Sequence, residues 1–194
     1  MALARQAEAT AGRMVTAAAR WMAYGGGVVL TAAAVLTVVS IIGRALLPLG
    51  LGPVKGDYEL VGMGCALAIF SFLPWCQLRR GHVTVDIFVS ALPLRVQAAL
   101  GFIGDTVLTL CSFVILWRLY LGFGEKYPYG SDAFRAALGL GSKPYYPETT
   151  YELAIPVWIP YGFAVIGAAV FFLVCLYTMW RSLNWTLDGQ EGGA

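Results

Sequence analysis

Four long apolar runs constrain the fold of this chain more than any other feature of its sequence. Each run is bounded by charged residues and has about the 20 apolar residues that a helix needs to cross a hydrocarbon core. Because lipid offers no water, every backbone polar group must be hydrogen-bonded within the protein, and a helix achieves this. With 59% hydrophobic and 12% charged residues, the chain is predicted to be an all-α integral membrane protein. The four transmembrane helices are predicted at about residues 22–43, 59–78, 96–118 and 155–180.

The segments outside these helices are assigned from their composition. Residues 1–20 are rich in alanine and carry three arginines, which favours a helix at the membrane surface, interrupted at Gly12. Residues 21–183 are expected to form one membrane domain, and residues 184–194 a C-terminal tail.

The outer loop, residues 119–154, is the longest polar segment. Ser131 is a suitable N-cap for a short helix over "DAFRAALG" that ends at Gly139 or Gly141. Tyrosines near membrane helices are typical of the aromatic belt, whereas rigid aromatic side chains beside prolines also suit protein contacts. Both interpretations stay open, and the second predicts a docking surface made of Tyr127, Tyr129, Tyr145 and Tyr146.

Charge counting leaves the orientation of the chain nearly open. Four helices place both termini on one side, which carries seven basic residues against six on the other. The three arginines before the first apolar run outnumber the two basic residues of the first loop, which favours cytoplasmic termini.

The stretch "QLRRGHVTVDIF", which follows the second apolar run, has the period of an amphipathic helix. Its polar stripe contains His82 and Asp86, its apolar face includes Val85, and Pro93 ends the pattern. The prediction is a short interfacial helix between the second and third transmembrane helices, with Arg79 and Arg80 beside lipid headgroups.

The reactive side chains of the sequence do not form a set that would indicate catalysis. The chain has one histidine, and its four cysteines show no C-x-x-C spacing, so neither a metal site nor thiol exchange is indicated. We expect no enzyme activity, no cofactor and no nucleic acid.

Asp105 is the one acidic residue within the third apolar run, and an intramembrane carboxylate is a functional candidate by default. Only Thr106, Thr109 and Ser112 are expected to help it. A transporter site needs several converging polar groups, so a structural hydrogen bond or a partner contact is favoured over an ion relay.

Small residues on the second helix indicate close helix packing. Gly62 and Ala66, and likewise Gly64 and Ala68, are spaced four residues apart, which lets another helix approach. Packing within the chain is favoured over packing against a partner.

The segment "LPWCQLRRGHVTVDIFVSALP", residues 73–93, resembles the signature of the small membrane subunit of TRAP transporters, the DctQ family. Its matching positions include Arg79, Arg80, Gly81, His82, Val85, Asp86 and Pro93. "IGDTVLTL" and "ELAIPVWIPYGFAVIG" in the third and fourth helices are similar to the same family.

The resemblance implies a scaffold subunit in the bacterial inner membrane, with cytoplasmic termini. Its implied partners are a large multi-span transport subunit, a periplasmic substrate-binding protein and membrane lipids. The implied process is sodium-driven uptake of small organic acids, with the substrate and sodium sites in the large subunit and none in this chain. The alternative is a small oligomeric ion-coupled transporter or channel that uses Asp105.

Overall fold

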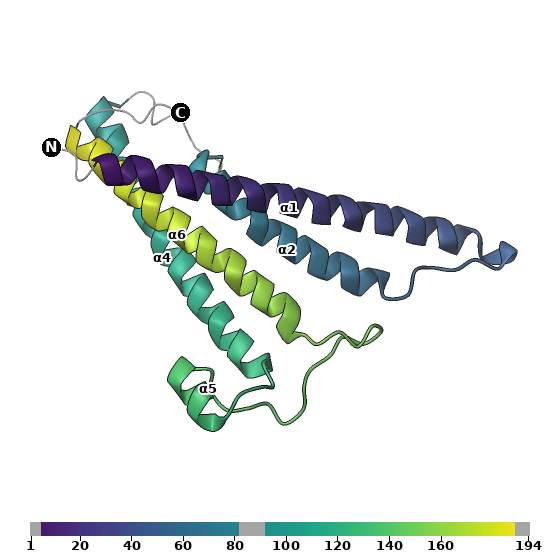
Figure 1. Ribbon diagram of the computed structural model, residues 1–194. Coiled ribbons are helices and arrows are strands. Elements are labelled where there is room, and N and C mark those ends of the chain that lie inside the picture. Colours follow the sequence, from purple (N-terminus) through teal and green to yellow (C-terminus); the bar gives the residue numbers. More distant parts are fainter. Residues whose placement is uncertain (1–4, 82–91, 189–194) are drawn as a thin grey trace. The chain divides into compact units, whose positions relative to one another are not determined.

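The computed structural model describes residues 5–81 and 92–188, and in these residues the chain is helical without any β-strand (Figure 1). The helices are α1 (Arg5–Ala45), α2 (Asp57–Leu78), α4 (Leu94–Lys126), α5 (Asp132–Leu138) and α6 (Trp158–Asp188), with a 3-10 turn η1 (Leu47–Leu49). Four of them are long and apolar enough to cross a membrane, which confirms the predicted all-α membrane fold. The interfacial helix expected between the second and third transmembrane helices falls on residues 82–91, outside the described residues.

Helix α1 differs from the prediction because it is continuous. One helix of 41 residues replaces the expected surface helix and first transmembrane helix, with no boundary at Arg20. Arginine is a good helix former, so a charge that marks the edge of an apolar run need not end the helix. Gly12 does not interrupt it either. A Cβ atom at Gly12 would lie 2.5 Å from the hydroxyl of Tyr177 on α6, so glycine serves close packing there.

The other long helices start near the predicted positions, and α2 ends at Leu78 as predicted, whereas α4 and α6 extend further. Helix α4 continues to Lys126 and α6 to Asp188, each about eight residues beyond the predicted end. The apolar run fixes only the part that lipid surrounds, whereas backbone hydrogen bonding continues into polar sequence. The short loop helix α5 was predicted correctly. The Ser131 hydroxyl accepts from the backbone N–H of Phe134, and Gly139 ends the helix with a left-handed φ of 65°.

The chain divides into two compact units, of which the first comprises Met1–Ala23, Phe72–Leu116 and Ala168–Ala194. Its buried centre is formed by Ala19 of α1, Leu78 of α2 and Val174 of α6. Around them pack the partly buried side chains of Val15, Trp75, Val170 and Tyr177.

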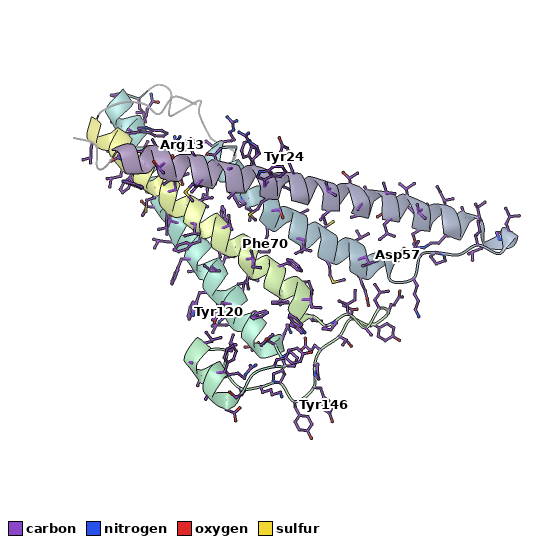
Figure 2. The ribbon with its side chains drawn as sticks, viewed as in Figure 1. Arg13, Tyr24, Asp57, Phe70, Tyr120 and Tyr146 are labelled. Carbon is purple, nitrogen blue, oxygen red and sulfur yellow. The ribbon has the colours of Figure 1, made fainter. Side chains whose placement is uncertain are left out.

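The second unit, Tyr24–Ser71 and Trp117–Gly167, contains the first loop and the outer loop. Here α1 and α2 lie side by side, and Asp57 at the start of α2 accepts hydrogen bonds from Ser40 and Arg44 of α1 (Figures 1 and 2). Buried small residues allow this approach. A Cβ at Gly64 would meet Val29 and Ala33 at ordinary contact distances of 3.5 and 3.6 Å.

Two glutamates join the outer loop to the start of α2 within the second unit. Glu59 accepts from the backbone N–H groups of Glu152 at 2.7 Å and Leu153 at 3.2 Å. In return, the carboxylate of Glu152 accepts from the N–H of Gly56 at 2.5 Å. These reciprocal bonds fix the end of the outer loop on α2.

Changing Gly43 to Ala is expected to destabilise the protein. The added Cβ would collide with the carbonyl oxygen of Gly52, a backbone atom that cannot turn away as a side chain can. Overpacking of this kind costs roughly 1–3 kcal/mol, and we expect the thermal unfolding midpoint in detergent to fall by several degrees.

Gly27 supplies the matched control, because it lies on the same helix with nothing within 4 Å of the position of its Cβ. Gly27→Ala should leave the midpoint unchanged or raise it slightly. Equal midpoints for the two variants would contradict the close approach of α1 and the first loop.

Candidate functional site

The carboxylate of Asp105, on α4 in the first unit, is bound by one side chain at the end of α2 and one in the turn that follows it. Gln77 donates from Nε2 to Oδ1 at 3.1 Å, and Nη2 of Arg80 lies 3.5 Å from Oδ2. The same Gln77 nitrogen donates to the hydroxyl of Thr178 on α6 at 2.9 Å. Gln77 and Thr178 are both buried. One amide group therefore connects three helices.

The partners expected for Asp105 from the sequence were wrong. The hydroxyls of Thr106, Thr109 and Ser112 instead donate to backbone carbonyls three or four residues earlier on the same helix, at 2.7–2.8 Å. A hydroxyl on a helix readily satisfies itself in this way, so its proximity in sequence to a carboxylate does not indicate a contact.

The motif residues that the structure describes lie at two helix ends. Arg79, Arg80 and Gly81 follow α2, and Pro93 precedes α4, where its carbonyl accepts from the N–H groups of Val96 at 2.8 Å and Gln97 at 3.1 Å. His82, Val85 and Asp86 lie outside the described residues. The motif thus places Arg80 where it reaches Asp105 on the next helix.

The small residues of α2 serve two different faces of the helix. Gly64 and Ala68 are buried, and Gly64 faces α1, as packing within the chain requires. Gly62 and Ala66 are exposed, and nothing lies within 4 Å of the Cβ position of Gly62. Only the second pair is available to another protein.

Arg135 on α5 organises the outer loop, and the sequence reasoning did not identify it. Its side chain is 1% exposed, and its hydrogen-bond acceptors in the described part of the chain are backbone carbonyls. Nε donates to the carbonyl of Gly141 at 3.0 Å. Nη1 donates to the carbonyls of Tyr127 and Tyr129 at 2.6 and 3.2 Å. Nη2 donates to the carbonyls of Gly124, Leu140 and Ser142 at 2.7, 3.1 and 2.9 Å. The only feature of the sequence that points to Arg135 is its place on a short loop helix that lies between glycines. Gly124 permits the arrangement, since a Cβ there would lie 2.6 Å from the carbonyl oxygen of Leu140.

The four loop tyrosines form two pairs rather than one surface. Tyr127 packs inside the second unit, with ring centroids 5.2 Å from Phe123 and 5.5 Å from both Tyr129 and Trp158. Tyr145 and Tyr146 contact each other at 4.7 Å and are 89% and 76% exposed. Figure 2 shows the Tyr146 side chain extending away from the loop. Of the four predicted docking residues, Tyr127 is the one packed inside, Tyr129 is 57% exposed, and Tyr145 and Tyr146 are the most exposed.

The fold and these contacts define a polytopic helical membrane protein whose polar side chains are largely used to join its own segments. The family model of the DctQ component of tripartite ATP-independent periplasmic transporters matches residues 33–184, which is most of the 194-residue chain. The chain belongs to this family. It is a small membrane subunit of a TRAP transporter, and its family is one of transporter components rather than enzymes. Comparisons with curated proteins and with solved structures found no match.

Gln77→Leu should destabilise the first unit while keeping nearly the same side-chain volume. The change removes the amide and leaves the Asp105 carboxylate and the Thr178 hydroxyl without the donor they share. Leaving buried polar groups unsatisfied costs about 1–3 kcal/mol each. We expect a clearly lower thermal unfolding midpoint in detergent.

Thr106→Val is the control for this substitution. It removes a hydroxyl whose hydrogen bond runs only to Phe102 of its own helix. Its midpoint should stay close to that of the unmodified chain, and a similar loss in both variants would exclude a special role for the bonds between helices.

Proposed function

We propose that this chain is the scaffold subunit that supports the large transport subunit during sodium-driven, binding-protein-dependent uptake of small organic acids. It works in the bacterial inner membrane with both termini in the cytoplasm, and residues 21–183 form its membrane domain. The substrate and sodium sites belong to the large subunit. Family membership supports the subunit assignment.

The observation that carries the scaffold role is the engagement of Asp105 by its own chain. Gln77 and Arg80 contact both carboxylate oxygens, so this group is used in joining helices. A transport site is built from several polar groups that converge near the middle of the membrane, commonly around broken helices. Helix α4 continues unbroken through Asp105. This arrangement suits a static subunit better than a carrier.

Uncovered apolar side chains support contact with a larger membrane partner. Helices α1 and α4 expose many large hydrophobic residues, among them Val28, Val35, Ile41, Ile103, Val107 and Leu110. Only 17% of the most apolar window of each helix is buried within the chain. In a membrane these faces contact either lipid or another protein. The exposed Gly62 and Ala66 on α2 would let a helix of the large subunit approach closely.

Purification in mild detergent should recover this chain together with a larger membrane subunit. In proteoliposomes the assembled complex should take up organic acids only with a sodium gradient and the binding protein, and this chain alone should transport nothing. Independent uptake by the isolated chain would contradict the proposal.

Asp105→Asn separates the scaffold from the alternative of an independent ion-coupled carrier. Asparagine keeps an oxygen that can accept from Gln77 but loses the charge that pairs with Arg80. A scaffold would lose some stability or assembly, while the complex that still forms transports normally. Loss of sodium-coupled uptake in a fully assembled complex would favour the carrier.

We also propose that the exposed pair Tyr145 and Tyr146 helps to dock the binding protein. Changing both to Ala should raise the apparent Michaelis constant for the loaded binding protein severalfold, because two rigid aromatic contacts are lost. The amount of assembled complex should not change. Tyr151→Ala, at another highly exposed tyrosine of the same loop, is the control. An unchanged constant in the double variant would leave only an interfacial role for the pair.

A further inference from the structure

Cationic and aromatic side chains from three segments gather within the first unit. We define the arginine cluster as Arg20 of α1, Arg79 and Arg80 after α2, and Arg181 of α6, together with Trp75 of α2 and Trp185 of α6.

Two guanidinium groups lie over each tryptophan ring of the cluster. The central carbon atoms of Arg79 and Arg20 lie 4.9 and 5.8 Å from the ring centroid of Trp75. Those of Arg80 and Arg181 lie 4.9 and 4.8 Å from that of Trp185. A ring attracts each cation, but two cations on one ring repel each other. The arrangement is therefore one that an anion would stabilise.

The cluster has more positive charges than the described residues neutralise. Asp105 pairs with Arg80 at 3.5 Å, and the nearby Glu8 carboxylate accepts from the amide of Asn184 at 2.6 Å. Among the described residues, no carboxylate forms an ion pair with Arg20, Arg79 or Arg181.

Arg181 also makes few of the hydrogen bonds that its guanidinium group could donate. In the described part of the chain its buried Nε has no partner, and Nη2 makes one long bond of 3.5 Å to the carbonyl of Leu78. A guanidinium has five N–H donors, arranged to match the oxygens of a phosphate or carboxylate. Arg181 therefore has capacity for an external acceptor.

The backbone of Arg80 adopts a conformation that is unfavourable for a residue other than glycine, and its side chain reaches α4. Arg80 has a φ of 49°, a left-handed conformation usually left to glycine, within the turn that ends α2. Its guanidinium passes over Gly101 of α4, 3.7 Å from the Cβ position of that glycine. Strained backbone conformations persist where surrounding contacts hold them, often at functional positions.

We propose that the arginine cluster binds the phosphate group of an anionic membrane lipid. Arginine and tryptophan at the ends of membrane helices lie at headgroup level, and basic pockets between such helices bind acidic headgroups. Trp21, next to Arg20, is 74% exposed and offers apolar surface for an acyl chain, which a free phosphate ion would not use. The site would join α1, α2 and α6 through one lipid molecule.

The test uses the full chain, alone and with its large subunit, in an uncharged detergent. Phosphatidylglycerol, phosphatidylcholine or inorganic phosphate is added, and binding is followed by native mass spectrometry and by the thermal unfolding midpoint. Phosphatidylglycerol should bind and raise the midpoint, whereas the other two should not. This comparison of added ligands tests the proposal on the unmodified protein, without any substitution. Equal effects of phosphatidylcholine or of inorganic phosphate would overturn the proposal.

Single substitutions then locate the site. Arg79→Gln and Arg181→Gln should each weaken phosphatidylglycerol binding by about fivefold, the effect of removing one arginine near an acidic headgroup. Arg118→Gln, at an exposed arginine of α4 in the second unit, should leave binding unchanged. Unchanged binding in both cluster variants would overturn the assignment. So would loss of the large subunit with lipid binding retained, because the cluster would then be a protein interface.

Discussion

The hydrogen bonds of the Gln77 amide are the contact on which the first unit depends. From one nitrogen, Gln77 donates to Asp105 of α4 and to Thr178 of α6, so a single side chain of α2 fixes two other helices. Between apolar helices in lipid the hydrophobic effect gives little preference for one packing over another, and polar contacts and close packing decide it. Arg80 extends the same network from the turn after α2. The described part of the segment that resembles the family signature therefore contains Gln77 and Arg80, which join the helices.

Arg135 has a comparable part in the second unit, but by different chemistry. A polar loop has too few apolar residues to form a core, and here a buried guanidinium bound to backbone carbonyls replaces one. Each bond fixes a point of the chain between Gly124 and Ser142. The aromatic contacts of Tyr127 with Phe123 and Trp158 enclose this arrangement. Tyr145 and Tyr146 follow directly after this region and remain exposed.

What the sequence could predict follows from how local each signal is. The four membrane helices are recognised because run length and hydrophobicity are properties of single segments, and α5 is recognised because Ser131 and Gly139 are caps. The partner of Asp105 could not be found, because Gln77 is 28 positions away and only the packing of helices brings it close. For the same reason, the burial of Arg135 could not be predicted from the sequence. Nor could spacing alone tell that Gly64 faces α1 while the similarly spaced Gly62 is exposed.

The unbroken length of α1 has a consequence for the membrane around it. At 1.5 Å per residue, its 41 residues form a rod of about 60 Å, roughly twice the thickness of a hydrocarbon core. The excess must be taken up by tilt or by helix outside the core. Arg20 and Trp21, near the middle of this helix, directly precede its long apolar run, so a substantial part of the helix lies before that run begins. A change in bilayer thickness would therefore change the tilt of one continuous helix and move its N-terminal part with it.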